Sequence, residues 1–104
     1  MFTVISTYSK ADGGELIDYL PELRFFGGTV NKFRSEQPGF VSFNHVMSDD
    51  LKQFSGTTVW ENEAACEASY TAENAQEEIM AAKNGLADFL NKHQISNSRE
   101  QHSS

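Results

Sequence analysis

The chain has 104 residues, a formal net charge of −7, 38% hydrophobic residues and 22% charged residues. This is the composition of one ordinary globular domain, and a chain of this length buries roughly two-thirds of its unfolded surface without needing disulfides. The eight Lys and Arg residues are scattered along the sequence. Sequence-independent binding to a phosphate backbone requires clustered basic residues, so we expect no nucleic-acid partner.

Cysteine usage and the apolar pattern narrow the cellular setting. Cys66 is the only cysteine, which excludes an intrachain disulfide and fits a reducing compartment. No stretch approaches the roughly 20 apolar residues that cross a bilayer, and residues 1–6 lack the pattern of a signal sequence. We therefore expect a cytoplasmic protein with no membrane contact. Metal-ligand spacings and phosphate-binding glycine patterns are also missing, so we expect no metal and no other cofactor.

The first part of the chain predicts a strand followed by a helix. Residues 2–9 alternate and are rich in β-branched side chains, which is typical of a strand. Apolar residues that recur every three or four positions predict a helix over residues 22–36. Pro38-Gly39 then ends this helix, because neither residue favours its continuation.

Three details concern the start and the interior of this helix. Asp12 and Glu15 have the spacing of a capping box, which predicts a short helical turn after them. Pro21 suits the first turn of a helix, where its missing amide costs nothing. Gly27 and Gly28 each weaken a helix by about 1 kcal/mol relative to alanine. Two alternatives therefore stay open, a continuous helix whose glycines allow close packing or a kink at this point.

The middle of the chain predicts a β-hairpin. Residues 40–48 and 53–60 read as strands joined by a short polar turn, which makes the pair antiparallel. On the first of them, His45 shares a face with Phe43, whereas Asn44 lies on the other face.

The last third of the chain predicts helices and then a tail. Asn62 is a predicted N-cap, and the residues that follow it to position 92 form two helices or one bent helix. Asn74 and Glu77 again have capping-box spacing. The remaining segment is polar and has nothing to bury. The predicted organisation is one domain over residues 1–93 followed by a mobile polar tail over residues 94–104.

The order strand, helix, strand, strand, helix and two short motifs carry a family resemblance. The motifs are Pro38-Gly39-Phe40 and the run Val-Trp-Glu-Asn-Glu-Ala over residues 59–64. On these residues the chain resembles the antibiotic biosynthesis monooxygenase-like family. The resemblance implies an α+β fold, a ferredoxin-like antiparallel sheet with helices on one face, which pairs into a dimeric α/β barrel. The family closes with a fourth strand, which is short or missing here because residues 94–104 are so polar. We therefore expect an unpaired edge on the first strand.

The resemblance also implies a cavity between the sheet and its helices. In the haem-degrading branch, a strand asparagine, a helix tryptophan and a helix histidine do the chemistry. Their places fall near Ser6 or Thr7, Ser69 and Ile79, and the mismatch disfavours haem degradation. The cofactor-independent, quinone-forming branch uses an asparagine, a tryptophan and an arginine. Asn44 and Trp60 have the right residue types for the first two.

The candidate site residues follow from these considerations. His45 is the candidate acid or base, because imidazole exchanges protons near neutral pH, and Asn44 is the second catalytic candidate. The predicted substrate-binding residues are Trp60, Tyr8, Phe43, Phe26 and Tyr70. Each also has a structural interpretation. We favour a core or interface anchor for Trp60, and partly buried packing residues with solvent-exposed hydroxyls for the two tyrosines.

Three functional hypotheses remain open. The first is an enzyme that oxygenates an aromatic or polyketide-like molecule without a cofactor, and the second is a non-catalytic ligand-binding module. The third is a structural dimerisation domain whose cavity is filled by aromatic residues, namely Phe26, Phe33, Phe89 and Trp60. The expected partners are a small aromatic ligand and a second copy of the chain. The helices can cover only one face of the sheet, so we expect a homodimer through the other face.

Overall fold

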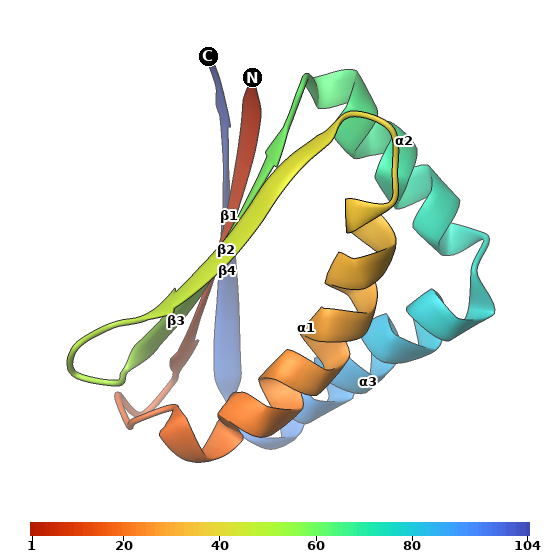
Figure 1. Ribbon diagram of the computed structural model, residues 1–104. Helices are drawn as coiled ribbons and strands as arrows, with labels where there is room; N and C mark the ends of the chain where they lie inside the picture. The colour runs from red at the N-terminus through yellow and green to blue at the C-terminus, as the bar shows by residue number, and fades with distance from the viewer.

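The computed structural model describes all residues 1–104 and is a four-stranded antiparallel sheet with its helices on one face (Figure 1). The strands are β1 (Phe2–Lys10), β2 (Phe40–Met47), β3 (Gln53–Trp60) and β4 (Ile95–Ser103). A short turn of 3-10 helix (Ile17–Tyr19) leads into α1 (Leu20–Ser35), and α2 (Glu63–Asn74) and α3 (Glu77–Lys92) follow β3. The strand order β2-β3-β1-β4 is that of a ferredoxin-like α+β fold, which confirms the predicted fold class.

The C-terminal segment is a full strand, so the prediction of a mobile tail over residues 94–104 was wrong, and so was that of a short or missing fourth strand. All nine residues of β4 pair with β1, from Ile95 opposite Lys10 to Ser103 opposite Phe2. β1 lies inside the sheet between β3 and β4. The unpaired edge expected on the first strand does not exist, and β2 and β4 form the two edges of an open sheet.

Backbone pairing rather than side-chain burial holds β4 in place. Ile95 is its only buried residue and anchors the start of the strand. Gln94 has a φ of 54°, and this left-handed conformation turns the chain from the end of α3 directly into β4. The Gln94 carbonyl accepts a hydrogen bond from the amide of Ala11, with an N–O distance of 2.9 Å. The turn is thereby tied to the end of β1, and pairing of the two strands satisfies their backbone groups.

Helix α1 is one continuous helix through Gly27 and Gly28. The expected close packing at these glycines is not found. A Cβ at Gly28 would meet nothing within 4 Å, and one at Gly27 would meet only the Asn31 amide nitrogen, at 3.9 Å. The close contact lies elsewhere, at Gly85 of α3, where a Cβ would stand 2.5 Å from the Phe26 ring.

Of the three caps predicted at helix starts, one is present in the structure and two are not. Asn62 caps α2 as predicted, since its side-chain oxygen accepts a hydrogen bond from a backbone amide of the first turn. Asp12 instead accepts from the Gly14 amide within a loop. Asn74 is the last residue of α2, and Gln76 precedes α3 without a side-chain cap, so neither predicted capping box forms. None of the helices combines the length and the apolarity that crossing a bilayer requires.

Two separate clusters make up the core between the sheet and the helices. The first consists of Phe2, Val4, Trp60 and Cys66, and the second of Leu16, Leu23, Phe54 and Ile95. Trp60 is fully buried and packs edge-on against Phe40, with the ring centroids 5.7 Å apart. The tryptophan is therefore a core anchor, which is the interpretation that the sequence favoured for it.

Candidate functional site

A cavity of about 790 Å³ lies between the inner face of the sheet and α1. Its walls include Val4 from the first core cluster and Leu23 and Phe54 from the second. The cavity therefore lies between the two core clusters. A space of this size excludes the hypothesis that aromatic side chains fill it, and it is in the range of small-molecule sites.

One row of paired residues across the four strands forms the floor of the cavity. Ser6 of β1 pairs with Gly56 of β3, His45 of β2 pairs with Gly56, and Arg99 of β4 pairs with Ser6. All four residues line the cavity. The rows on either side carry larger side chains, namely Phe43, Thr58 and Val4 on one and Met47, Phe54 and Tyr8 on the other. Gly56 lets the Phe43 ring lie directly over the sheet, since a Cβ at this position would stand 3.2 Å from that ring, and the small side chain of Ser6 keeps the neighbouring part of the floor low.

We call Tyr8, Phe43, His45 and Phe54 the aromatic end of the cavity. The His45 imidazole packs beside Phe54 and Phe43, with centroid distances of 5.3 and 5.9 Å. Tyr8 stacks on Phe54 at 6.4 Å. This end offers flat apolar surfaces for a planar molecule and one imidazole, a side chain that can serve as an acid or base.

Tyr8 places a phenol on the β1 wall of the same cavity. Burial raises the pKa of the Tyr8 hydroxyl above its usual value, and the positive charge of Arg34 offsets part of that rise. The hydroxyl therefore stays protonated at neutral pH and can donate a hydrogen bond to a ligand.

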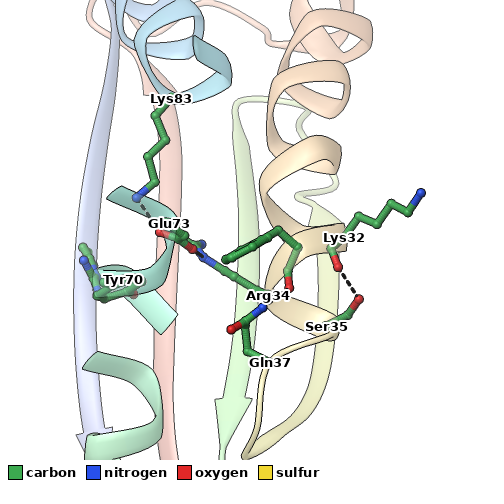
Figure 2. A network of polar contacts seen from close by, with 9 residues as sticks. Lys32, Arg34, Ser35, Gln37, Tyr70, Glu73 and Lys83 are labelled. Carbon is green, nitrogen blue, oxygen red and sulfur yellow. Dashed lines mark hydrogen bonds and ion pairs between the residues drawn. The ribbon is translucent and has the colours of Figure 1, made fainter. Parts of the chain in front are cut away.

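The opposite side of the cavity, which we call the basic end, consists of Arg34, Tyr70, Lys83 and Arg99. Figure 2 shows Arg34 of α1 and Lys83 of α3 reaching toward Glu73 from two sides. The Glu73 carboxylate is completely buried, whereas the side chains of Arg34 and Lys83 keep 22% and 29% of their surface exposed. One buried carboxylate thus holds two cations at the cavity wall and joins all three helices.

Three cationic side chains lie around the ring of Tyr70 in α2. The Arg99 guanidinium lies 4.6 Å from the ring centroid, the Arg34 guanidinium 5.0 Å and the Lys83 ammonium 5.7 Å. Arg99 also donates a hydrogen bond to the Tyr70 hydroxyl. Burial and a hydrogen bond with Cys66 raise the pKa of Tyr70 to about 12, against the opposing charges of Arg34 and Arg99. Tyr70 is therefore a neutral platform for cations.

The structure brings four of the seven predicted site residues together. Tyr8, Phe43, His45 and Tyr70 all line the cavity. The other three lie outside its wall, and each has a different reason. Asn44 follows the alternation of β2 and faces the opposite side of the sheet from His45, where it pairs with Thr57. Trp60 belongs to the core, and Phe26 packs against Gly85 between α1 and α3.

Sequence reasoning missed the residues that carry charge into the cavity, Arg34, Lys83 and Arg99. Arg99 was overlooked because its segment was expected to be a tail. Arg34 and Lys83 stand on helices as ordinary polar residues, and nothing in their spacing links them to Tyr70. The available signal was the alternation of Ile95, Asn97 and Arg99, which places those side chains on one face of a strand.

Similar solved structures were found, while no protein-family model and no curated protein sequence matches the chain. SnoaB from Streptomyces nogalater, a cofactor-independent oxygenase, is 15% identical over 99% of this chain and 91% of its own, with a TM-score of 0.70. The monooxygenase ActVA-Orf6 of Streptomyces coelicolor, in complex with nanaomycin D, is 17% identical over 99% and 88%, with a TM-score of 0.63. A structure named only as an antibiotic biosynthesis monooxygenase is 21% identical over 100% and 98%, with a TM-score of 0.61.

These likenesses concern the fold. The chain has the fold of antibiotic biosynthesis monooxygenase structures over essentially its whole length, as the sequence resemblance implied. They assign no role to its residues. No three His, Cys, Asp or Glu side chains come together in a way that could hold a metal ion.

Proposed function

We propose that this protein is a cofactor-independent monooxygenase that acts on a small electron-rich aromatic molecule, with His45 as the acid or base. The observation that supports this most is the cavity of about 790 Å³, which has an aromatic end and a basic end. Its walls are apolar and aromatic at one end and carry a few convergent polar groups, which is the usual make-up of a small-molecule site. The names of the similar structures, monooxygenase and cofactor-independent oxygenase, support the reaction type.

The proposed reaction converts a methylene group between two aromatic rings into a carbonyl. His45 takes a proton from that carbon, and the rings delocalise the resulting negative charge. The carbanion is oxidised by dioxygen with formation of a carbon–oxygen bond, and the protonated His45 returns its proton to the outer oxygen, which gives a hydroperoxide on the carbon. Loss of water then leaves the ketone, so that one oxygen atom enters the product and the other leaves as water. The substrate itself is the reductant, which is why no metal or organic cofactor is needed.

The proposed working unit is a homodimer that forms through the outer face of the sheet, the face away from the helices (Figure 1). By strand alternation this face carries small or β-branched residues over most of its area, among them Thr3, Ile5, Thr57 and Val59. Glu100 is the only residue with a formal charge at neutral pH on this face. A flat, nearly uncharged sheet face suits a twofold partner. Sedimentation at micromolar concentration should give a dimer, and Thr57→Arg should give a monomer.

Oxygen uptake with anthrone as substrate tests the proposed activity. We expect dioxygen consumption equal to anthraquinone formed, with one atom of labelled oxygen in the product. His45→Gln should slow turnover by about 100-fold or more, which is the usual contribution of a positioned acid or base. His93→Gln is the matched control, because His93 lies at the end of α3, outside the cavity wall and off the outer face of the sheet, and its loss should leave turnover unchanged.

Three results would count against this proposal. The first is oxygen uptake with anthrone that is no faster than in buffer. The second is full activity of His45→Gln. The third is a bound aromatic molecule with no product formed, which would make the protein a binding module instead.

A further inference from the structure

We infer that the cavity takes an anionic aromatic molecule, an aromatic carboxylate that lies along the floor row with its carboxylate at Arg99 and its ring at His45. The inference names the substrate class for the proposed monooxygenase, and to that extent it rests on the proposed function. Its binding part stands without any turnover.

Positive charge is concentrated at the cavity. Three of the eight Lys and Arg residues in the chain, Arg34, Lys83 and Arg99, place their charges around Tyr70 at the basic end, whereas the Lys32 side chain points away from this group (Figure 2). No Asp or Glu side chain lines the cavity, although the chain holds 15 of them and has a net charge of −7. Glu73 lies completely buried beside the basic end and offsets one of the positive charges there. An acidic protein thus keeps a basic cavity, which attracts anions and repels cations.

Arg99 has hydrogen-bond donors at the basic end that can bind a carboxylate. Glu73 engages Nε and Nη2 of Arg34, with 3.4 Å for the Nη2 contact. Arg99 uses one of its nitrogens, Nη2, on the Tyr70 hydroxyl. The guanidinium of Arg99 keeps further N–H groups, and its planar fork matches the two oxygens of a carboxylate. The cation–π contact with Tyr70 holds this guanidinium in place at the cavity wall.

The floor row sets the distance between His45 and Arg99. His45 and Arg99 stand on the two edge strands of the sheet, and only Gly56 and Ser6 separate them. Three strand spacings put about 14 Å between the backbones at the two ends of the row. A span of this length suits a planar acid of two or three rings. Ser6 leaves room for the ligand, and the Phe43 ring, which lies over Gly56, offers a flat surface on which it can stack.

Binding of 2-naphthoate and of its neutral amide, 2-naphthamide, tests the inference by calorimetry or fluorescence on the full chain. We expect the carboxylate to bind about tenfold more tightly than the amide, the gain of roughly one charge-assisted contact. The preference should shrink when the salt concentration rises from about 50 to about 500 mM, because part of it is screened. Arg99→Gln should abolish the preference, since Arg99 is exposed on an edge strand and its loss leaves the fold intact.

Lys92→Gln is the matched control, because it removes the same charge from an exposed position outside the cavity wall and should keep the full preference. Equal affinity for the two probes, no detectable binding of 2-naphthoate at millimolar concentration, or a preference that survives Arg99→Gln would overturn the inference. None of these readouts depends on oxygen consumption. Failure of the monooxygenase proposal would leave a carboxylate preference standing, and loss of that preference would leave anthrone turnover untouched.

Discussion

The two ends of the cavity are built in different ways. At the aromatic end, Phe43, His45 and Phe54 stand on the two strands of one hairpin and pack as rings on a regular sheet face. The basic end takes Arg34 from α1, Tyr70 from α2, Lys83 from α3 and Arg99 from β4. One end therefore depends on local strand geometry, and the other depends on charges that the whole fold brings together.

This difference separates two tasks of a binding site. A flat aromatic surface accepts many planar molecules, because stacking contacts carry little directional information. Fixed cations discriminate by charge and set the orientation of the ligand along the cavity. If the two ends are independent, a substitution at one end should leave the stability and the binding properties of the other end unchanged.

The largest effect is expected from Glu73→Gln. The change removes the only negative charge among Arg34, Lys83 and Arg99, and unpairing partly buried cations typically costs about 3 kcal/mol. Urea unfolding should show this loss in the free energy of unfolding. Glu78→Gln on the exposed face of α3 should change it by less than about 0.5 kcal/mol. An unchanged stability of Glu73→Gln would mean that the basic end is not held together by charge.

The next effect concerns the floor that joins the two ends. Ser6→Leu should fill the hollow over the central row and weaken binding of 2-naphthoate by about tenfold or more. Its melting temperature should stay the same or rise, because the added methyl groups enter empty space rather than a packed core. Ser6→Ala keeps the hollow open and should bind as the parent does. Full affinity in Ser6→Leu would place the ligand somewhere other than this row.

Two glycines sharpen the comparison between open and packed parts of the helical layer. Gly27→Ala should stabilise the protein by about 1 kcal/mol, because its Cβ meets no close neighbour and alanine favours the helix. Gly85→Ala should destabilise it by about 1–2 kcal/mol, because its Cβ would overlap the Phe26 ring. Paired thermal unfolding curves give both values. The same sign for both substitutions would contradict the described packing of α1.

The smallest effect is a pH dependence at the basic end. Tyr70 has a pKa of about 12 in the folded protein, above the ordinary value of 10.0, so folding favours its protonated form. Its contribution to stability is complete below pH 10 and is lost as the pH rises through about 12. At about pH 11, absorbance of tyrosinate near 295 nm should therefore increase when the protein unfolds. A smaller increase in Tyr70→Phe would assign the signal, and an equal one would contradict it.

Most of the scaffold and the placement of Tyr8, Phe43 and His45 on strands could be predicted because they follow from local periodicity, whereas Phe54 was not among the predicted site residues. Strand alternation put His45 beside Phe43, and the Asn62 cap and the hairpin formed where their residues indicated. β4 escaped prediction because polar residues fill eight of its nine positions, and only the backbone of β1 explains its conformation. The basic end could not be predicted without β4, since its cations meet only when residues 34, 70, 83 and 99 are brought to one place.

The central claim is that one ligand spans both ends of the cavity. A crystal structure of the complete chain with 2-naphthoate tests it most directly. We predict electron density for the naphthalene between Phe43 and Phe54 beside His45, with the carboxylate within hydrogen-bond distance of Arg99. A reversed ligand, with its ring at Tyr70 and its carboxylate toward His45, or a ligand on the outer face of the sheet, would contradict the account.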